Sequence, residues 1–314
     1  MAIAIVISGW QAGQWRDAMA RLAPERTLRL YPDDLGDRAD ITYALVWKPA
    51  PGVLATFPNL RAILSLGAGV DPVLKDPDLP DVPLVRVADP DMTMRMSEYV
   101  VQHVLMHHRQ QRRLDALQAE AAWKPFDQWP ASVMRVGVMG LGVLGADAAL
   151  KLQMMGFKVA GWSRSRKEIA GLECYAGEAE LGAFLARTDI LVSLLPLTAN
   201  TRGLIDRKLI GQLAKDGPLE APVLVNAGRG GSQVESDILA ALDAGELYAV
   251  TLDVFETEPL PPESPLWRHP KVTITPHMAA DSDPDTICRY VLGQIERIEQ
   301  GQPPQNVVDR SRGY

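Results

Sequence analysis

The feature of this chain that most constrains its fold is a glycine-rich turn between an apolar run and a helix-forming stretch. Residues 135–145 read Arg-Val-Gly-Val-Met-Gly-Leu-Gly-Val-Leu-Gly, and residues 146–155 have a helix-like composition. In the spacing G-x-G-x-x-G the first glycine permits a tight turn, the second admits a pyrophosphate to the backbone, and the third lets the helix pack on the strand. The alternative is a glycine-rich turn that only redirects the chain, but the flanking strand and helix favour a dinucleotide site. The residues predicted to form it are Gly140, Leu141, Gly142, Val143, Leu144 and Gly145.

The next apolar run, residues 157–162, ends where the adenosine ribose of such a ligand is expected. An acidic residue that would bind the ribose 2′-hydroxyl is replaced there by Ser163, Arg164, Ser165, Arg166 and Lys167. A carboxylate would repel a 2′-phosphate, whereas a guanidinium and hydroxyl donors would bind it. The sequence therefore predicts NADP rather than NAD, with Ser163, Arg164 and Ser165 as contacts. A basic solvated turn is the alternative.

Composition narrows the class of partner and the compartment. The chain has 314 residues, 47% of them hydrophobic, and a net charge of −7, so it suits two domains and disfavours nucleic acid or an anionic membrane as partner. The two cysteines, Cys174 and Cys288, stand far apart, which supports neither a disulfide framework nor a metal site. Since the first residues form a strand-length apolar run without a basic leader, and no stretch is long enough to span a membrane, we expect a cytoplasmic protein.

Short apolar runs alternate with polar or helix-forming segments along most of the chain. This alternation predicts an α/β fold with two doubly wound parallel sheets, a flavodoxin-like substrate domain and a Rossmann-like cofactor domain, with a cleft between them. A long helix is expected at 97–117, and the helical tail at 287–300 is expected to pack back on the N-terminal domain. The predicted domains are 1–97 plus 285–314 and 98–284. The predicted strands are 3–7, 43–47, 62–66, 84–87, 136–139, 158–162, 190–195, 223–226, 249–253 and 273–275.

Three polar residues follow predicted strands of the second domain, at the edge where open α/β sheets bind ligands: Arg229, Glu258 and His277. A histidine exchanges a proton near neutral pH, a carboxylate beside it favours its protonated form, and an arginine holds a carboxylate or a developing alkoxide. Reduction of a 2-keto acid needs these roles. Taken singly, each residue also has an ordinary interpretation, as a loop cation, a surface acid and a helix-cap or partly buried histidine.

The motifs in this order resemble the D-isomer-specific 2-hydroxyacid dehydrogenase family over nearly the whole chain. They are the glycine turn at 140–145, Leu-Pro-Leu-Thr-Ala-Asn-Thr-Arg-Gly-Leu-Ile at 195–205, Asn-Ala-Gly-Arg-Gly at 226–230, Leu-Asp-Val-Phe-Glu-Thr-Glu-Pro at 252–259 and Thr-Pro-His at 275–277. Three further segments resemble the glyoxylate/hydroxypyruvate reductase A type within that family. They are Leu-Gly-Ala-Gly-Val-Asp at 66–71, Trp-Ser-Arg-Ser at 162–165 and the terminal Val-Asp-Arg-Ser-Arg-Gly-Tyr at 308–314.

The resemblance implies a role for each site residue. Arg229 would bind the substrate's carboxylate and carbonyl, His277 would be the general acid, and Glu258 would orient His277. Asp253 would contact the nicotinamide carboxamide, and the nicotinamide and its ribose would be lined by Leu195, Pro196 and Ala227. The substrate carboxylate would be held by backbone amides around Gly67, Ala68, Gly69 and Val70, although this loop could also simply turn the chain.

Trp47 ends a predicted strand and would form a wall that restricts the substrate to a small acid, with ordinary core packing as the alternative. The expected activity is reduction of small 2-oxo acids such as glyoxylate and hydroxypyruvate with NADPH, with NADH used more weakly. Two alternatives stay open: an NAD-dependent dehydrogenase of a bulkier D-2-hydroxy acid, and a binding protein that senses its cofactor. The resemblance also suggests a homodimer.

Overall fold

The computed structural model describes residues 1–9, 11–281 and 283–311, which form two compact units. Unit 1 comprises Met1–Met92 and Asp281–Tyr314, and unit 2 comprises Thr93–Ala280. The sequence analysis placed these boundaries after residue 97 and before residue 285. Of the terminal motif, Arg312, Gly313 and Tyr314 lie outside the described residues.

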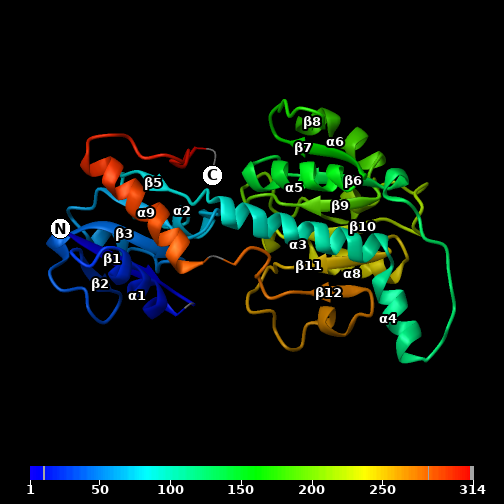
Figure 1. Cartoon of the computed structure of the whole chain (residues 1–314), viewed down its shortest axis with the longest axis horizontal. Coiled ribbons are helices and arrows are strands. Elements are labelled where there is room, and N and C mark those ends of the chain that lie inside the picture. Colours follow the sequence, from blue (N-terminus) through cyan, green and yellow to red (C-terminus); the bar gives the residue numbers. More distant parts are fainter. Residues whose placement is uncertain (10, 282, 312–314) are drawn as a thin grey trace. The chain divides into compact units, whose positions relative to one another are not determined.

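Unit 1 is built on a five-stranded parallel sheet in the order β2-β1-β3-β4-β5, which is the flavodoxin-type order. All six residues of β1 are buried, as expected for a parallel strand covered on both faces. Helices α1 and α9 pack against each other beside this sheet (Figure 1). The elements are β1 Ala2–Ile7, α1 Ala12–Leu22, β2 Thr27–Leu30, β3 Ile41–Trp47, β4 Ala62–Ser65, α2 Asp71–Leu74, β5 Leu84–Val85 and α9 Pro284–Glu299.

Unit 2 is built on a seven-stranded parallel sheet in the order β12-β11-β10-β9-β6-β7-β8. Numbered within the unit, this is the Rossmann order 3-2-1-4-5-6 with one added strand. Strands β7 and β8 are added on one side of β6, and β9 to β12 are added on its other side, so the strand order changes direction between β6 and β9. The predicted fold class, two doubly wound parallel-sheet α/β domains, is confirmed. The strands are β6 Arg135–Met139, β7 Lys158–Ser163, β8 Glu173–Ala176, β9 Ile190–Ser193, β10 Val223–Asn226, β11 Ala249–Leu252 and β12 Val272–Ile274.

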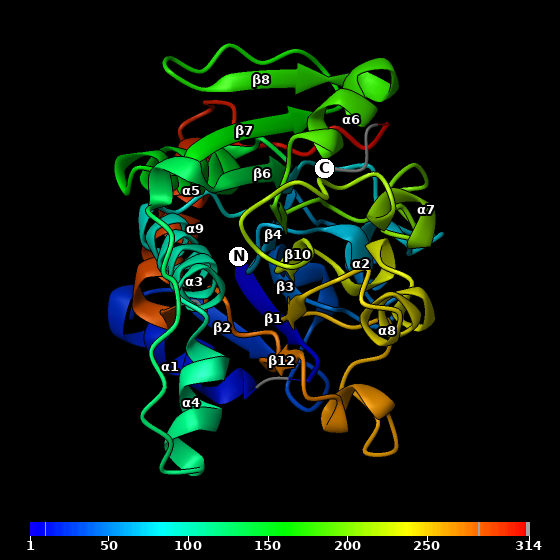
Figure 2. The same ribbon diagram turned by 90° about the vertical axis from the view of Figure 1, so that its right-hand side faces the viewer.

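Helices cover both faces of the seven-stranded sheet (Figure 2). Val138 and Val192 share a core with α3 and α5, whereas their neighbours Met139 and Leu191 share a second core with α6, α7 and α8. Alternate strand residues therefore serve opposite layers, as the pleat of a strand requires. The helices are α3 Pro90–His108, α5 Val143–Met154, α6 Gly177–Ala186, α7 Arg207–Ile210 and α8 Glu235–Asp243.

The predicted long helix at 97–117 is wrong in its bounds. Helix α3 ends at His108, and a separate helix, α4 Gln111–Ala119, starts after Gln110, whose φ of 53° lies in the left-handed region and ends the helical path. The other predicted strands form with small shifts at their ends. Strands β2 and β8 were not predicted, because as half-buried edge strands they lack a continuous apolar run.

Short 3-10 helices connect several of these elements. They are Arg38–Asp40, Leu54–Thr56, Ala131–Val133, Gly230–Ser232 and Pro265–Arg268. Within residues 1–9, 11–281 and 283–311, none of the helices combines the length and the apolar composition that crossing a bilayer requires.

Candidate active site

The turn between β6 and α5 has the geometry that a dinucleotide phosphate site needs. Gly140 has φ of 102°, and a Cβ on it would lie 2.8 Å from the carbonyl oxygen of Leu194. A Cβ on Gly145 would lie 1.8 Å from the carbonyl oxygen of Gly140, so only glycine allows this close packing of helix on turn. A Cβ on Gly142 would meet nothing within 4 Å. Space therefore lies beside Gly142, which is the N-cap of α5, and helix N-termini favour anions.

Between these glycines the chain offers backbone rather than side chains to a ligand. Leu141 is 4% exposed and packs on β7, because a Cβ on Gly161 would lie 2.4 Å from its Cδ2 atom. Val143 and Leu144 begin α5, and the Val143 side chain is half exposed. The residues present fit a bound pyrophosphate through their amides.

The basic turn after β7 is held by its own hydrogen bonds. Ser163 Oγ donates to the carbonyl oxygen of Ser165 at 2.8 Å. Arg166 Nη1 donates to the carbonyl oxygen of Cys174 at 2.6 Å, and its Nη2 pairs with Glu180. Arg166 therefore ties this turn to β8 and α6, while Arg164 and Ser165 lie on its exposed surface.

The three residues predicted for proton transfer follow three neighbouring strands of unit 2. Arg229 follows β10, Glu258 follows β11 and His277 follows β12, so all three lie at the carboxyl edge of the sheet. His277 Nδ1 lies 2.8 Å from Glu258 Oε2. Because a carboxylate only accepts hydrogen bonds, Nδ1 carries the proton in this contact, and Nε2 is the ring nitrogen that the contact does not use. The His277 side chain is 31% exposed and that of Glu258 is 22% exposed, so both are partly shielded from water.

His277 has an unusual backbone conformation. Its φ of 54° lies in the left-handed region, which non-glycine residues adopt only where surrounding contacts hold them. Its amide donates to the backbone carbonyl oxygen of Asp253 at 2.8 Å. This contact fixes the loop after β12 against the end of β11.

Two buried amide side chains shape the loop that carries Arg229. Asn226 is fully buried, and its Nδ2 donates to Gln233 Oε1 at 2.7 Å and to the carbonyl oxygen of Arg229 at 3.3 Å. Gln233 Nε2 in turn donates to the carbonyl oxygen of Val254 at 2.9 Å. The sequence analysis did not single out Asn226 or Gln233. The signal that could have identified Asn226 is a polar amide side chain at the last position of an otherwise apolar strand, where an apolar residue would be expected.

The residues expected around the nicotinamide lie at the same edge of the sheet. Leu195 and Ala227 are 5% and 6% exposed, and Pro196 is half-buried. Asp253 is 1% exposed and accepts hydrogen bonds from the Thr275 hydroxyl and from backbone amides that follow His277. Asp253 therefore fixes the loop that carries His277, in addition to any contact with the nicotinamide.

The loop at 66–70 belongs to unit 1, where it joins β4 to α2. Gly67 and Val70 are buried, and Ala68 and Gly69 are partly exposed. The Gly67 amide donates to Ser65 Oγ at 3.3 Å, so this amide serves the loop itself. Trp47 is 9% exposed, and a Cβ on Gly67 would lie 2.5 Å from its Cζ3 atom. Trp47 thus packs directly on the predicted substrate loop.

Residues 101–279 match the model of the family described as D-isomer specific 2-hydroxyacid dehydrogenase, NAD binding domain. The chain belongs to the D-isomer specific 2-hydroxyacid dehydrogenase family. It is 42% identical to the glyoxylate/hydroxypyruvate reductase A of Salmonella newport (strain SL254) over 311 residues, which covers 97% of each chain.

Solved structures of other members of this dehydrogenase family have the same architecture. The NADPH-dependent glyoxylate/hydroxypyruvate reductase of Sinorhizobium meliloti, in complex with NADP and sulfate, is 48% identical with a TM-score of 0.95, and the match covers 100% of both chains. A probable 2-hydroxyacid dehydrogenase of Rhizobium etli CFN 42, in complex with NADP, HEPES and L(+)-tartaric acid, is 44% identical with a TM-score of 0.94, again over 100% of both chains.

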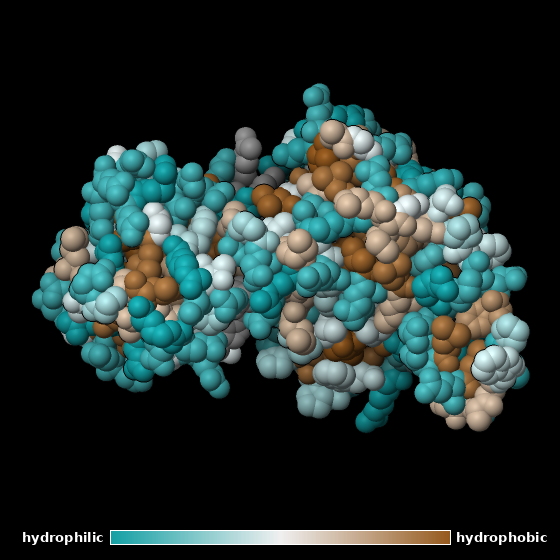
Figure 3. Space-filling view, viewed as in Figure 1, coloured by the Kyte–Doolittle hydropathy of each residue, from teal (hydrophilic) through white to brown (hydrophobic). Residues whose placement is uncertain are grey.

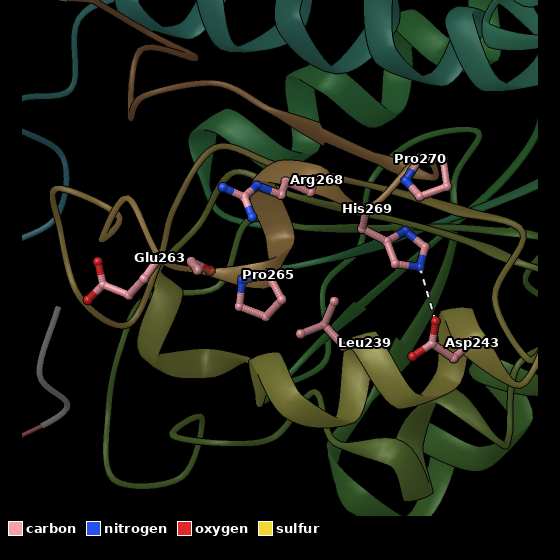
Figure 4. Close-up of a pocket in the computed structure, with 8 residues that line it drawn as sticks. Leu239, Asp243, Glu263, Pro265, Arg268, His269 and Pro270 are labelled. Carbon is pink, nitrogen blue, oxygen red and sulfur yellow. Dashed lines mark ion pairs between the residues drawn. The ribbon is translucent and has the colours of Figure 1, made fainter.

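A pocket elsewhere on unit 2 of this dehydrogenase family member contains none of the predicted site residues. It has a volume of about 610 Å³ and lies between α8 and the segment 263–270. Asp243 and His269 both line it and point toward each other, with His269 Nε2 at 3.4 Å from Asp243 Oδ1, whereas Arg268 and Glu263 point away from this pair (Figure 4). The side chains that line the pocket do not converge on one point, so we place the reactive site at the sheet edge instead.

Proposed function

We propose that this protein is an NADPH-dependent reductase of small 2-oxo acids such as glyoxylate and hydroxypyruvate. The observation that carries the proposal is the 2.8 Å contact between His277 and Glu258 at the carboxyl edge of a Rossmann-type sheet, the edge that also carries Arg229. Relatives that match nearly the whole chain bear the name of this activity.

The proposed proton transfer uses His277 and Glu258 together. Bound NADPH supplies the hydride that goes to C2 of the substrate. His277 donates the Nε2 proton to the carbonyl oxygen, while Glu258 accepts the hydrogen bond from Nδ1 and holds the ring in place. Arg229 binds the substrate carboxylate and stabilises the negative charge that develops on the carbonyl oxygen.

The proposed cofactor site uses the amides of the glycine turn for the pyrophosphate, and Ser163, Arg164 and Ser165 for the 2′-phosphate. Support comes from the open space beside Gly142 and from the exposure of Arg164. We assign the main charge contact to Arg164, because it directly follows Ser163, which stands where an acidic residue would bind a ribose 2′-hydroxyl. Leu195, Pro196, Ala227 and Asp253 are assigned to the nicotinamide end.

We propose that the backbone amides of Ala68, Gly69 and Val70 bind the substrate carboxylate. Gly67 mainly lets Trp47 approach the loop closely, because it has no side chain. The ring of Trp47 packs on this loop and would exclude bulky side chains at C3 of the substrate. We propose that the substrate domain comprises residues 1–97 plus 285–314 and that the cofactor domain comprises residues 98–284.

A substrate panel tests the activity directly. Glyoxylate, hydroxypyruvate, pyruvate and phenylpyruvate are each offered with NADPH and with NADH, and kcat/KM is measured for every pair. The proposal expects the two small acids with NADPH to give the highest values. Preference for phenylpyruvate with NADH would instead identify a dehydrogenase of bulkier acids, and no turnover with any pair would leave a cofactor-sensing protein.

We also propose that the protein is a homodimer. Hydrophobic residues gather on the face of unit 2 that carries α3, α4 and α5 (Figure 3). The chain in and after α4 exposes Trp123 at 98%, Leu114 at 39% and Trp129 at 38%. Large exposed aromatic side chains are enriched where a second chain binds. Light scattering coupled to size exclusion chromatography tests this proposal, and a monomer at micromolar concentration would contradict it.

A cytoplasmic location is the last part of the proposal. Cys174 and Cys288 are both free thiols, and burial raises the pKa of Cys288 to about 12, so its thiol is unreactive. Proteins without disulfides are typical of reducing compartments. Cell fractionation with an antibody against the chain tests the location.

A further inference from the structure

A chain of side-chain hydrogen bonds joins α3 to the loop that carries His277. The hydroxyl of Tyr99, on α3, lies 2.8 Å from Thr275 Oγ1. Thr275 Oγ1 donates to Asp253 Oδ1 at 2.6 Å. Tyr99 is 8% exposed and Asp253 is 1% exposed, so water competes little for these contacts.

The direction of the hydrogen bonds follows from the chemistry of the groups. A threonine hydroxyl has a single proton, and Thr275 uses it toward the Asp253 carboxylate, which only accepts. Tyr99 must therefore be the donor to Thr275. Burial raises the pKa of Tyr99 far above its usual value, so its hydroxyl keeps the proton needed for this role.

At its other end the chain of hydrogen bonds fixes three consecutive backbone amides. Asp253 accepts from the His277 amide with its backbone oxygen at 2.8 Å. Its side chain accepts from the Met278 amide with Oδ1 at 2.9 Å and from the Ala279 amide with Oδ2 at 3.1 Å. These bonds hold His277 in its left-handed conformation, and that conformation determines where the imidazole points.

The hydrogen-bonding capacity of Asp253 explains why the Thr275 hydroxyl matters. A carboxylate offers about four acceptor positions. Among the described residues, Thr275 and Met278 fill Oδ1 and Ala279 takes one position of Oδ2, which leaves Oδ2 one further acceptor position. Without the Thr275 hydroxyl the Asp253 side chain would keep only the Met278 and Ala279 amides as donors, so the carboxylate and these two amides would be held less firmly.

The ring of His103 covers Tyr99 at a centroid distance of 4.2 Å. Burial lowers the pKa of His103, so the ring stays uncharged at neutral pH and shields the hydrogen bonds rather than competing for them. Tyr99 is thus held in place from within its own helix.

We propose that Tyr99 and Thr275 are positioning residues for the proton donor His277, acting through Asp253. This role rests on the proposed function, because it assumes that His277 donates the proton. Loss of either hydroxyl would lower the fraction of time in which the imidazole points at the carbonyl oxygen. The step affected is proton transfer, whereas binding of NADPH at the glycine turn would be unchanged.

The test compares variants that remove a hydroxyl with variants that keep one. Thr275→Val has the same shape without the hydroxyl, Thr275→Ser restores it, and Tyr99→Phe removes the donor. Tyr43→Phe is the matched control, because the Tyr43 hydroxyl is buried in unit 1 and has no hydrogen-bond partner among the described residues. Each variant is assayed for kcat and KM with glyoxylate and NADPH, and for amide hydrogen exchange of Met278 and Ala279.

We expect Thr275→Val to lower kcat about 10-fold and Tyr99→Phe about 3-fold, with the KM for NADPH within about 2-fold of wild type. Thr275→Ser and Tyr43→Phe should keep kcat within about 2-fold of wild type. In Thr275→Val the two amides should exchange about 10-fold faster, as expected for loss of one hydrogen bond in their support.

Unchanged exchange in Thr275→Val would overturn the inference, and so would faster exchange with an unchanged kcat. An equal loss of kcat in Tyr99→Phe and Tyr43→Phe would also overturn it, since the effect would then be general destabilisation. The proposed function fails separately, if the wild-type protein reduces no 2-oxo acid. Hydrogen exchange would still decide in that case whether Thr275 supports the His277 loop.

Discussion

Acidification should destabilise this protein through His107, which lies near the end of α3. Its side chain is 2% exposed, and its Nε2 lies 2.8 Å from Thr251 Oγ1 on β11. Burial is the main cause that lowers the pKa of His107 to about 3, and the nearby His103 ring and Arg112 guanidinium act in the same direction, since each would repel a charged imidazole when it carries its own proton. The native state therefore keeps this imidazole neutral over the whole physiological range of pH.

The size of the effect follows from proton linkage. An unfolded histidine has a pKa of about 6.5, so below that pH the unfolded state binds a proton that the native state does not. Stability is complete above the unfolded pKa and is lost as the pH falls from there toward the native pKa. With a native pKa of about 3, His107 alone should remove about 2 kcal/mol of unfolding free energy between about pH 7.5 and pH 5. The pKa values of His103 and His108 are also lowered by burial, so both add to the loss in the same direction.

Urea unfolding followed by circular dichroism at both pH values measures this loss. In His107→Gln, which has no titrating group at this position, the loss on acidification should be smaller than in wild type by about 2 kcal/mol. Thr251→Val is the matched control, because it removes the hydrogen-bond partner and keeps the buried imidazole. It should lower stability by about 1 kcal/mol at both pH values and retain the acid sensitivity. An equal loss on acidification in His107→Gln and wild type would refute the reasoning.

Three further outcomes test the site. His277→Ala should lower kcat for reduction by about two to four orders of magnitude without weakening NADPH binding, as measured by steady-state kinetics and fluorescence titration; near-normal turnover would remove His277 from the mechanism. Arg164→Ala should weaken NADPH by about 1.5–3 kcal/mol in calorimetric titration and leave NADH unchanged, and unaltered selectivity would contradict the phosphate contact. Gly67→Ala should raise the KM for glyoxylate about 10-fold, because its Cβ would lie 2.5 Å from Trp47 Cζ3. Gly13→Ala, whose Cβ meets nothing within 4 Å, is its control, and equal KM values in the two variants would count against a substrate role for the loop.

The sequence by itself determined the fold class and the positions of most strands. A parallel strand covered on both faces must be apolar along its whole length, so apolar runs such as 190–195 and 223–226 can be predicted as strands from the sequence alone. The glycine turn at 140–145 was equally predictable, because Gly140 and Gly145 each answer a local steric need, such as the 1.8 Å approach of a Cβ on Gly145 to the Gly140 carbonyl oxygen. The pairing of Glu258 with His277 could be anticipated, since residues after neighbouring parallel strands meet at one edge of the sheet.

Only the tertiary structure decided features that depend on partners far apart in the chain. Strands β2 and β8 exist because a neighbouring strand offers them hydrogen bonds, and their own half-buried sequences do not require it. The break between α3 and α4 depends on one left-handed residue, Gln110, within a continuous helix-forming pattern. Tyr99 and Thr275 are separated by 176 positions, so no local pattern connects them. Their hydrogen bond forms because α3 packs on the sheet face beside β12, and that packing is a property of the folded unit as a whole.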